Sequence, residues 1–323
     1  QILTALQENR DRFLSGEELA GALFVSRNAV WKAVQALRKE GHAIEAATNR
    51  GYRLTQDGDL FTPSSIAAHL GEKAELFRIR VERSLPSTNN TLKALAEKEA
   101  PEGTVVAAVE QSEGRGRQGR RFYSPMGGAY FSLLLRPMMS APDATLITTA
   151  AAVAAAEAVE EVTGLPAGIK WVNDVYVRGR KVCGILTEGS FIAETGGLDY
   201  VVLGVGVNVE PPEEGYPEDI AGRAGTLFDG PAPPGTKGRL VARVLLRLWD
   251  FLPRLEEKPH LEPYRARLFL TGREIDVVAG DTVRRAVALG LDEDFRLRVR
   301  YPDGKEEALI GGEVRVVPGV EAL

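Results

Sequence analysis

The sequence contains very few of the residues that build covalent or metal-binding sites. Its 323 residues include one cysteine and three histidines. A single cysteine excludes a disulfide within this chain and a metal site made of cysteines. Cys183 lies in the apolar run 182–186, which is typical of a small buried hydrophobic residue rather than a nucleophile. The histidines His42, His69 and His260 are scattered and form no helical HExxH pair, so we expect no zinc site.

Long apolar segments are also missing. A membrane-spanning helix needs roughly 18–20 apolar residues, whereas the longest candidate, 150–159, is shorter and contains Glu157. The first residues show no basic stretch followed by an apolar one, which is the pattern of a secretory signal. We therefore expect a cytoplasmic protein that has no membrane association.

The overall composition is that of a soluble globular protein, with 44% hydrophobic and 26% charged residues. The chain length predicts two or three domains, since single domains usually have roughly 100–200 residues. The formal net charge is −5, which argues against nucleic-acid binding over the whole surface. Any contact with DNA must therefore come from a local basic patch.

The first 60 residues predict a winged helix-turn-helix domain. Ser15, with Glu18 three residues later, is typical of a capping box that opens a helix. Ser26 is a suitable N-cap for a second helix at 27–39, whose apolar residues share one face. Two short strands follow within 44–54. The order of helix, short turn, helix and hairpin is that of winged helix domains.

DNA binding is the function that this domain predicts. The segment 1–60 is neutral overall, with eight basic and eight acidic residues, but its second helix is basic, which suits contacts with phosphates. In helix-turn-helix proteins the N-terminal side chains of this helix face base edges in the major groove. The alternative is a small helical dimerisation or scaffolding domain with a solvated charged face. The predicted DNA-binding residues are Ser26, Arg27, Asn28 and Lys32.

The rest of the chain predicts two more domains, so we expect an α+β multidomain protein. In 61–270, strands and helices are mixed, and the apolar stretch 200–209 predicts a central strand. In 271–323, short strands and a hairpin signal at 302–304 predict a small all-β barrel. The strands expected are 78–84, 104–111, 129–136, 168–172, 175–177, 181–188 and 200–209, then 274–278, 283–289, 295–301, 306–310 and 313–317; the main helices expected are 143–162 and 237–255.

The most unusual segment is 114–121, which carries four arginines among three glycines. The glycines fit the G-x-G-x-x-G pattern, but that motif needs a helix at its third glycine, and the sequence 120–128 is not helical. It is not a P-loop either, because Gly119 precedes two arginines. What remains is a flexible loop whose guanidinium groups suit carboxylate or polyphosphate ligands. The alternative is a solvated basic loop, or one that binds nucleic acid.

Five short motifs follow one another along the chain. They are Ser87–Asn89, Gln111 with Gly114–Arg120, Lys170–Asp174, Gly179–Leu186 and Gly204–Asn208. In this order and at these spacings they resemble the bifunctional biotin protein ligase and biotin operon repressor family. The resemblance covers nearly the whole chain, including the N-terminal domain and the closing segment 311–314. It implies a class II synthetase-like central domain and an SH3-like C-terminal β-barrel.

The resemblance implies a two-step reaction. Biotin and Mg²⁺·ATP give biotinyl-5′-AMP and pyrophosphate, and a lysine of a biotin carboxyl carrier protein then takes the biotin and releases AMP. It also implies a repressor that binds operator DNA as a homodimer. No protein nucleophile is required, which fits the lack of a Ser, Cys or His constellation in the sequence. A lipoate or octanoate ligase and a transcription factor that only senses a metabolite are the two rival interpretations.

The resemblance also implies roles for individual residues. Polar groups on a short turn suit a ureido ring, because its N–H and C=O groups must be paired once buried. The implied biotin-binding residues are Ser87, Thr88, Asn89, Gln111, Arg115, Gly116, Arg117 and Lys181. The implied ATP-binding residues are Arg117, Arg120, Phe122, Asn173 and Asn208, the implied Mg²⁺ ligand is Asp174, and the implied catalytic residues are Arg115, Arg117, Arg120 and Lys181.

Several of these assignments have a structural alternative. For the segment 87–89 it is a helix cap, and both roles can hold at once. For Lys181 it is a solvated lysine beside a hairpin turn, and for Asn173 and Asp174 an exposed turn between strands. The glycines of 204–208 could equally allow close packing of strands.

Overall fold

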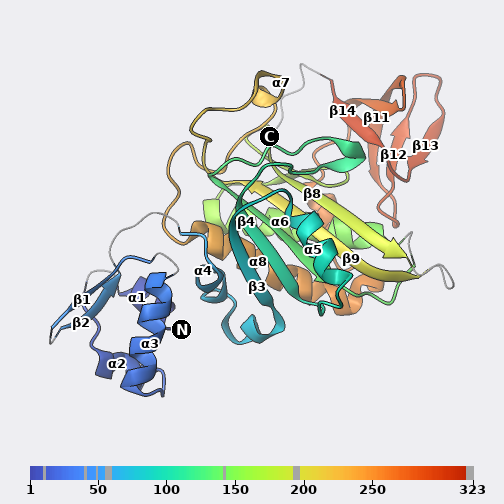
Figure 1. The fold of residues 1–323 in the computed structure, drawn as a ribbon. Coiled ribbons are helices and arrows are strands. Elements are labelled where there is room, and N and C mark those ends of the chain that lie inside the picture. The colour runs from blue at the N-terminus through green and yellow to red at the C-terminus, as the bar shows by residue number, and fades with distance from the viewer. Residues whose placement is uncertain are drawn as a thin grey trace.

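The computed structural model describes residues 1–9, 12–39, 42–48, 50–54, 60–140, 143–191 and 197–317. The N-terminal part forms the predicted winged helix-turn-helix. Its helices α1 (Ile2–Glu8), α2 (Gly16–Ala22) and α3 (Arg27–Lys39) precede an antiparallel hairpin of β1 (Ile44–Ala47) and β2 (Gly51–Leu54). This part, blue in Figure 1, lies to one side of the larger body and next to α4 (Pro63–Ala67).

Local hydrogen bonds explain where the helices of this part begin. The Ser15 hydroxyl accepts from the backbone N–H of Glu18, and the Glu18 carboxylate accepts from the backbone N–H of Ser15, which is the predicted capping box. The Ser26 hydroxyl accepts from the N–H of Ala29 at 3.1 Å and caps α3. The buried side chains form an apolar cluster of their own: Leu3, Leu6, Leu14, Leu19, Ala20, Val30, Val34, Leu37, Ile44 and Leu54.

A seven-stranded mixed sheet forms the centre of the molecule. Its order is β3-β4-β5-β9-β8-β7-β6, with β3 and β4 parallel and the other neighbouring pairs antiparallel. The central place of β9 confirms the prediction made from its apolar sequence. The strands are β3 (Arg78–Leu85), β4 (Thr104–Gln111), β5 (Gly128–Leu135), β6 (Gly168–Lys170), β7 (Asp174–Val177), β8 (Arg180–Phe191) and β9 (Leu198–Asn208).

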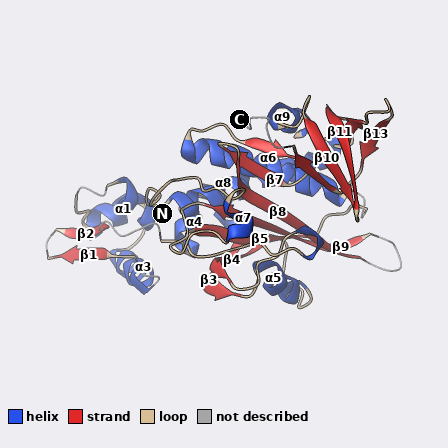
Figure 2. Ribbon diagram, turned by 90° about the horizontal axis from the view of Figure 1, so that it is seen from above, coloured by secondary structure: helices blue, strands red, loops and turns tan. Residues whose placement is uncertain are grey.

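Helices cover both faces of this sheet (Figure 2). The helices α6 (Ala144–Thr163) and α8 (Thr236–Phe251) pack on one face, and α5 (Thr88–Ala96) packs on the other. Successive side chains of a strand point to opposite faces, so Val105 of β4 joins the apolar cluster of α6 and α8, while Val106 joins that of α5. The remaining helices are η1 (Gly71–Leu76), η2 (Arg117–Gly119), α7 (Glu218–Ala221), η3 (Leu252–Glu257) and α9 (Leu261–Arg267).

The last part of the chain forms a five-stranded antiparallel sheet. Its order is β13-β12-β11-β10-β14, so β13 and β14 are the edges of the sheet. The sequence predicted a small barrel for this part of the chain. Its apolar side chains belong to the same cluster as the central sheet. The indole N–H of Trp171 donates to the backbone carbonyl of Phe295 at 2.8 Å and joins the two parts. The strands are β10 (Glu274–Ala279), β11 (Thr282–Leu291), β12 (Leu297–Arg300), β13 (Glu306–Leu309) and β14 (Glu313–Val316).

The predicted domain limits near residues 60 and 270 remain predictions. The first follows residues 55–59, which lie outside the described part of the chain, and the second falls between α9 and β10. Within the described ranges, no helix combines the length and the apolar character needed to cross a membrane.

Candidate functional site

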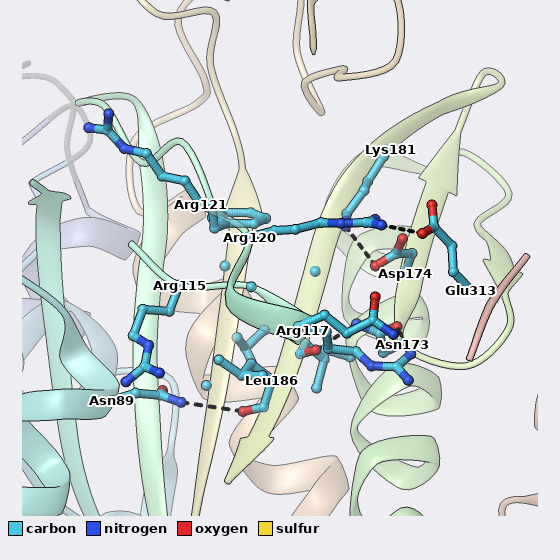
Figure 3. A pocket seen from close by; sticks show the side chains of 18 of the residues that line it. Asn89, Arg115, Arg117, Arg120, Arg121, Asn173, Asp174, Lys181, Leu186 and Glu313 are labelled. Carbon is cyan, nitrogen blue, oxygen red and sulfur yellow. Dashed lines mark hydrogen bonds and ion pairs between the residues drawn. The ribbon is translucent and has the colours of Figure 1, made fainter. Parts of the chain in front are cut away.

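One cavity of about 180 Å³ brings the predicted motifs together (Figure 3). It lies between the start of α5, the strands β8 and β9, the glycine-rich loop 114–121 and residues 312–314 of the C-terminal sheet. Its lining includes all the residues predicted for the catalytic domain except Asn208, namely Ser87, Thr88, Asn89, Gln111, Arg115, Gly116, Arg117, Arg120, Phe122, Asn173, Asp174 and Lys181.

Polar side chains at the start of α5 form one end of the cavity. Ser87, Thr88 and Asn89 are only 2–4% exposed. The Ser87 hydroxyl accepts from the N–H of Asn90 and so caps α5. The side-chain carbonyl of Gln111 accepts from the backbone N–H of Thr88 at 2.8 Å. The motif therefore caps a helix and lines the cavity, so both interpretations of its sequence hold.

Two side chains beside this polar end were not predicted from the sequence. Ser132 of β5 is fully buried, and its hydroxyl lies 2.8 Å from that of Thr88 and 2.6 Å from Oδ1 of Asn89. Glu188 of β8 accepts a hydrogen bond from Nδ2 of Asn89 at 2.8 Å. No local motif marks either residue, because their contacts depend on the order of the strands. The alternation of β8 is the one available indication, since it puts Glu188 on the same face as Leu186.

The glycine-rich loop crosses the cavity as an ordered turn. Only η2 is helical, and Gln118 within it has a φ of 55°, so no dinucleotide-binding helix follows the glycines. Gly114 has no room for a side chain, because a Cβ there would lie 2.3 Å from the backbone oxygen of Phe122. The N–H of Gly116 donates to the carbonyl of Arg120 at 2.7 Å and fixes the turn. The loop thus holds its arginines in defined positions.

Arg117 and Arg120 reach from this loop toward the far end of the cavity. Arg117 donates to Oδ1 of Asn173 at 3.0 Å and to the backbone oxygen of Gly312 at 3.4 Å. Arg120 forms an ion pair with Glu313. The hydrogen bond from Arg120 lowers the pKa of Glu313 to about 2, against the smaller opposing effect of burial. Both guanidinium groups are therefore held by the C-terminal sheet as well as by their own loop.

The other two arginines of the loop lie elsewhere. Nη1 of Arg115 donates to Oδ1 of Asn90 at 2.9 Å, which places it over the start of α5. The side chain of Arg121 extends away from the labelled cluster in Figure 3 and donates to the backbone oxygen of Ser112 at 3.0 Å. The four arginines therefore serve different places, and Arg121 is the one directed outward.

Lys181 and Asp174 form an ion pair at 2.7 Å on the cavity wall (Figure 3). Their side chains are 31% and 18% exposed, so neither is a fully solvated residue of a hairpin turn. Nδ2 of Asn173 donates to the backbone oxygen of Ile185 at 2.7 Å and turns its Oδ1 toward Arg117. The segment is a built part of the cavity rather than an exposed turn.

Three glycines of β8 and β9 give the cavity its floor. A Cβ at Gly184 or Gly206 would lie 2.9 Å or 2.5 Å from the ring of Phe122. A Cβ at Gly204 would lie 2.2 Å from Oδ1 of Asn89. These glycines make room for cavity side chains, which is a more specific role than close packing of strands.

Asn208 differs from its prediction, since it is absent from the lining of this cavity. It is 8% exposed, and its Nδ2 donates to the backbone oxygen of Gly225 at 3.0 Å. The backbone carbonyl of Asn208 accepts from the backbone N–H of Leu227 at 3.0 Å. Because its amide is bonded to the segment after α7, Asn208 positions that segment instead of facing the cavity.

Metal ligands and nucleophiles are scarce in this site. Cys183 is fully buried, and burial raises the pKa of its thiol to about 12, so it is the inert hydrophobic residue that we predicted. In the described part of the chain, no group of three or more His, Cys, Asp and Glu side chains could hold a metal ion. Asp174 nevertheless offers one carboxylate to an ion that brings phosphate ligands with it.

The predicted DNA-binding side chains lie together at the exposed start of α3. Trp31 lies one turn further along α3 and is 52% exposed. It was not predicted from the sequence as a DNA-binding residue. Residues three and four apart on a helix are neighbours, so its indole shares a face with Arg27 and Asn28. Phe24, in the preceding turn, is 96% exposed. The exposed predicted residues are Ser26, Arg27, Asn28 and Lys32.

Comparison with known proteins agrees with this arrangement. Residues 81–208 match the biotin/lipoate A/B protein ligase family, and residues 1–53 match an HTH domain. The chain is 36% identical to the bifunctional ligase/repressor BirA of Bacillus subtilis over 76% of this chain and 75% of that protein. It is 27% identical to the Escherichia coli protein of the same name over 97% and 95%, respectively. The solved biotin protein ligase of Aquifex aeolicus in complex with biotin and ATP has 28% identity and a TM-score of 0.61, covering 74% of this chain and 99% of that one.

Proposed function

We propose, because this chain belongs to the family of bifunctional biotin ligases and repressors, that its cavity joins biotin to ATP and passes the biotin to a lysine. One observation carries the proposal. Arg117, Arg120 and Lys181 line a cavity whose other end is a buried polar pocket. Biotin has a small polar ring and a carboxylate, and ATP has a polyphosphate chain. The two ends of the cavity have the matching chemistry.

The polar end suits the ureido ring of biotin. An N–H or C=O group that leaves water must find a hydrogen-bond partner, and this end presents the side chains of Thr88, Asn89 and Gln111. Apolar side chains in the same lining suit the rest of the molecule. We assign the following residues to biotin: Ser87, Thr88, Asn89, Gln111, Arg115, Gly116, Arg117 and Lys181.

Charge is the main obstacle in the first step. A carboxylate oxygen of biotin attacks the α-phosphorus of ATP, a new O–P bond forms, and the bond to the pyrophosphate breaks. Two anions must approach each other, so cations fixed at the reacting atoms lower the barrier. We assign this role to Arg115, Arg117, Arg120 and Lys181. We place the adenine against the ring of Phe122 and the phosphates near Asn173.

We propose that Mg²⁺ binds together with ATP. Mg²⁺ usually binds through one or two carboxylates plus substrate phosphates. Two carboxylates line the cavity, those of Asp174 and Glu313. Glu313 is paired with Arg120 and Arg315, so we assign Mg²⁺ to Asp174. The bound ion neutralises phosphate charge. Asp174 also has a task of its own, because its 2.7 Å ion pair directs the ammonium group of Lys181 along the cavity wall.

The second step transfers biotin to its acceptor. The amine of a lysine on a biotin carboxyl carrier protein attacks the carboxyl carbon of the mixed anhydride, an amide bond forms, and AMP leaves with the electron pair of the broken C–O bond. The same cations stabilise the departing phosphate. The glycine-rich loop and residues 312–314 line the cavity, and we infer that they protect the anhydride from water.

We extend the proposal to DNA. The exposed Arg27, Asn28 and Lys32 suit an operator, and a homodimer would present two such helices to two half-sites. A protein that acts on operator DNA and on a carrier protein works in the cytoplasm. Gel-shift assays with and without biotin and ATP test the binding to DNA. Equal operator binding in the presence and absence of both ligands would contradict ligand-controlled repression.

Release of pyrophosphate from ATP tests the enzyme directly. We expect release that depends on biotin, together with transfer of labelled biotin to a carrier domain. Arg117→Ala should slow both at least about tenfold. Arg121→Ala is the matched control, because Arg121 borders the cavity but directs its guanidinium away from it, to the backbone oxygen of Ser112. Release with lipoate or octanoate but not biotin would favour the lipoate ligase interpretation. No release with any of the acids would favour a metabolite-sensing transcription factor.

A further inference from the structure

Glu188 joins three segments of the chain at the polar end of the cavity. Its carboxylate accepts from Nδ2 of Asn89 at 2.8 Å, pairs with Nζ of Lys93 at 2.6 Å and lies 3.7 Å from Nη2 of Arg115. Asn89 and Lys93 belong to α5, and Arg115 belongs to the glycine-rich loop. The Glu188 side chain is 18% exposed and is not part of the cavity lining. Three donor groups thus surround a carboxylate that lies next to the polar end of the cavity but does not line it.

This carboxylate is the nearer of two acceptors that fix the orientation of the Asn89 amide, since Nδ2 also donates to the backbone oxygen of Leu186 at 3.5 Å. A carboxylate only accepts hydrogen bonds, so the amide nitrogen faces Glu188 and the amide oxygen faces the hydroxyl of Ser132, 2.6 Å away. A Cβ at Gly204 would lie 2.2 Å from the same oxygen, so this side of the amide is tightly enclosed. Asn89 is 4% exposed, and water has little access to either end.

The orientation passes from Asn89 to the next polar group. The Ser132 hydroxyl has one hydrogen and two neighbours, Oδ1 of Asn89 and the hydroxyl of Thr88. Oδ1 can only accept, so it takes that hydrogen. The Thr88 hydroxyl lies 2.8 Å from that of Ser132 and donates to Oε1 of Gln111 at 3.2 Å, so its single hydrogen serves these two acceptors. The charge on Glu188 therefore helps to set the orientation of the Asn89 amide and, through it, the direction of the Ser132 hydroxyl.

Glu188 also holds one end of the glycine-rich loop. Arg115 bonds to Asn90 with one nitrogen and faces Glu188 with the other. Arg117 and Arg120 are held at the opposite end by Asn173 and the C-terminal sheet. The loop is thus fixed separately at its two ends.

The charge on Glu188 persists at neutral pH. Burial alone would raise the pKa of this carboxyl, but the hydrogen bonds from Asn89 and Lys93, with the nearby Arg115, outweigh burial and hold the pKa below its ordinary value. Glu188 is therefore a fixed acceptor under the conditions in which a biotin ligase works.

We propose that Glu188 is a positioning residue that sets the hydrogen-bonding pattern of the biotin pocket and ties the Arg115 end of the glycine-rich loop to it. The inference rests on the proposed function, because it assigns this pocket to biotin. Its partners lie at the polar end, away from Arg120 and Lys181. Glu188 therefore acts on the binding of biotin much more than on the binding of ATP.

The test is Glu188→Gln, assayed by biotin-dependent release of pyrophosphate. Glutamine keeps the shape but turns an N–H₂ group toward Nδ2 of Asn89 or Nζ of Lys93, and each of these atoms only donates. We expect the KM for biotin to rise about tenfold or more, as for loss of a charged hydrogen bond, and the KM for ATP to change less than about twofold. Glu188→Asp keeps the charge and should recover most of the affinity for biotin.

Lys93→Met is the matched control, because it removes one ion pair and leaves the bond between Glu188 and Asn89. Its KM for biotin should rise less than that of Glu188→Gln. An unchanged KM for biotin in Glu188→Gln, or equal rises in both KM values, would overturn the inference. If the glutamine variant does not fold, Glu188→Asp decides: a small rise in the KM for biotin alone would support the inference, and an unchanged KM for biotin or equal rises in both KM values would overturn it. A wild-type protein that releases no pyrophosphate contradicts the proposed function instead.

Discussion

Arg120 of the glycine-rich loop and Glu313 of β14 form an ion pair although 193 positions separate them in the sequence. Arg315 donates to the other oxygen of Glu313 at 3.0 Å and holds it in place. Arg117 adds a bond to the neighbouring carbonyl of Gly312. Contacts from the C-terminal sheet therefore hold the loop against the cavity, and we infer that they keep the cavity closed.

Glu313→Gln should loosen this closure without unfolding the protein. The side chains of Arg120 and Glu313 are 56% and 17% exposed, so solvent screening keeps the loss of stability below about 1 kcal/mol. Water should reach the anhydride more often, and AMP released without a carrier protein should rise about two- to fivefold. The control is Glu306→Gln, another glutamate paired with arginines on the same sheet but in β13. Equal AMP release in the two variants would contradict closure by Glu313.

Gly206→Ala should weaken the binding of ATP. The new Cβ would lie 2.5 Å from the ring of Phe122, so the ring must move from the place that we assign to adenine stacking. Loss of one stacked base contact predicts a rise in the KM for ATP of about tenfold. Gly222→Ala is the control, because nothing lies within 4 Å of its added Cβ. Steady-state kinetics with varied ATP measure this KM. An unchanged KM for ATP in Gly206→Ala would show that Phe122 does not contact ATP.

The sequence predicted the parts of this site that depend on local order. The capping box at Ser15 and Glu18 and the helix cap at Ser87 need only neighbours a few residues away. The motifs that line the cavity were found because a family resemblance fixes their order. Glu188 and Ser132 were missed because their contacts with Asn89 arise only when β5 and β8 take their places in the sheet.

The same reason explains why Asn208 does not line the cavity. The family resemblance implies that Asn208, at the end of a glycine-rich strand, binds ATP. Its amide instead donates to Gly225, in a segment whose path the sequence does not reveal. Glu313 likewise has no local feature that could announce its contact with Arg120.

Trp31→Ala should weaken DNA binding and leave biotin transfer unchanged. The exposed indole shares a face of α3 with Arg27 and Asn28, where an apolar group can contact a thymine methyl. Loss of such a base contact predicts about tenfold weaker binding to a duplex selected from a random library. Leu76→Ala, another exposed apolar residue, is the control outside this domain. Equal DNA affinity of Trp31→Ala and wild type, measured by fluorescence anisotropy, would exclude Trp31 from the interface.

His260 predicts a loss of stability in weak acid. It is fully buried, stacked on Phe295 with ring centroids 4.6 Å apart, with Nε2 2.9 Å from the hydroxyl of Thr149 in α6. Burial, with a smaller contribution from Lys258, lowers the pKa of His260 from 6.5 to about 4. As the pH falls below 6.5 the unfolded chain takes up a proton that the folded protein resists until about pH 4. The free energy of unfolding therefore falls across this window.

His260→Phe should remove this part of the pH dependence. Phenylalanine keeps the stacking on Phe295, and Thr149 retains its bond to the backbone oxygen of Thr145 at 3.1 Å. Between pH 7 and pH 4.5, wild type should lose about 2–3 kcal/mol more stability than the variant, since each unit of pKa shift is worth about 1.4 kcal/mol. Both proteins share every carboxylate, so acid effects at those groups cancel in the comparison. Urea unfolding at the two pH values measures the difference, and parallel losses in the two proteins would mean that His260 takes up its proton as easily when folded as when unfolded.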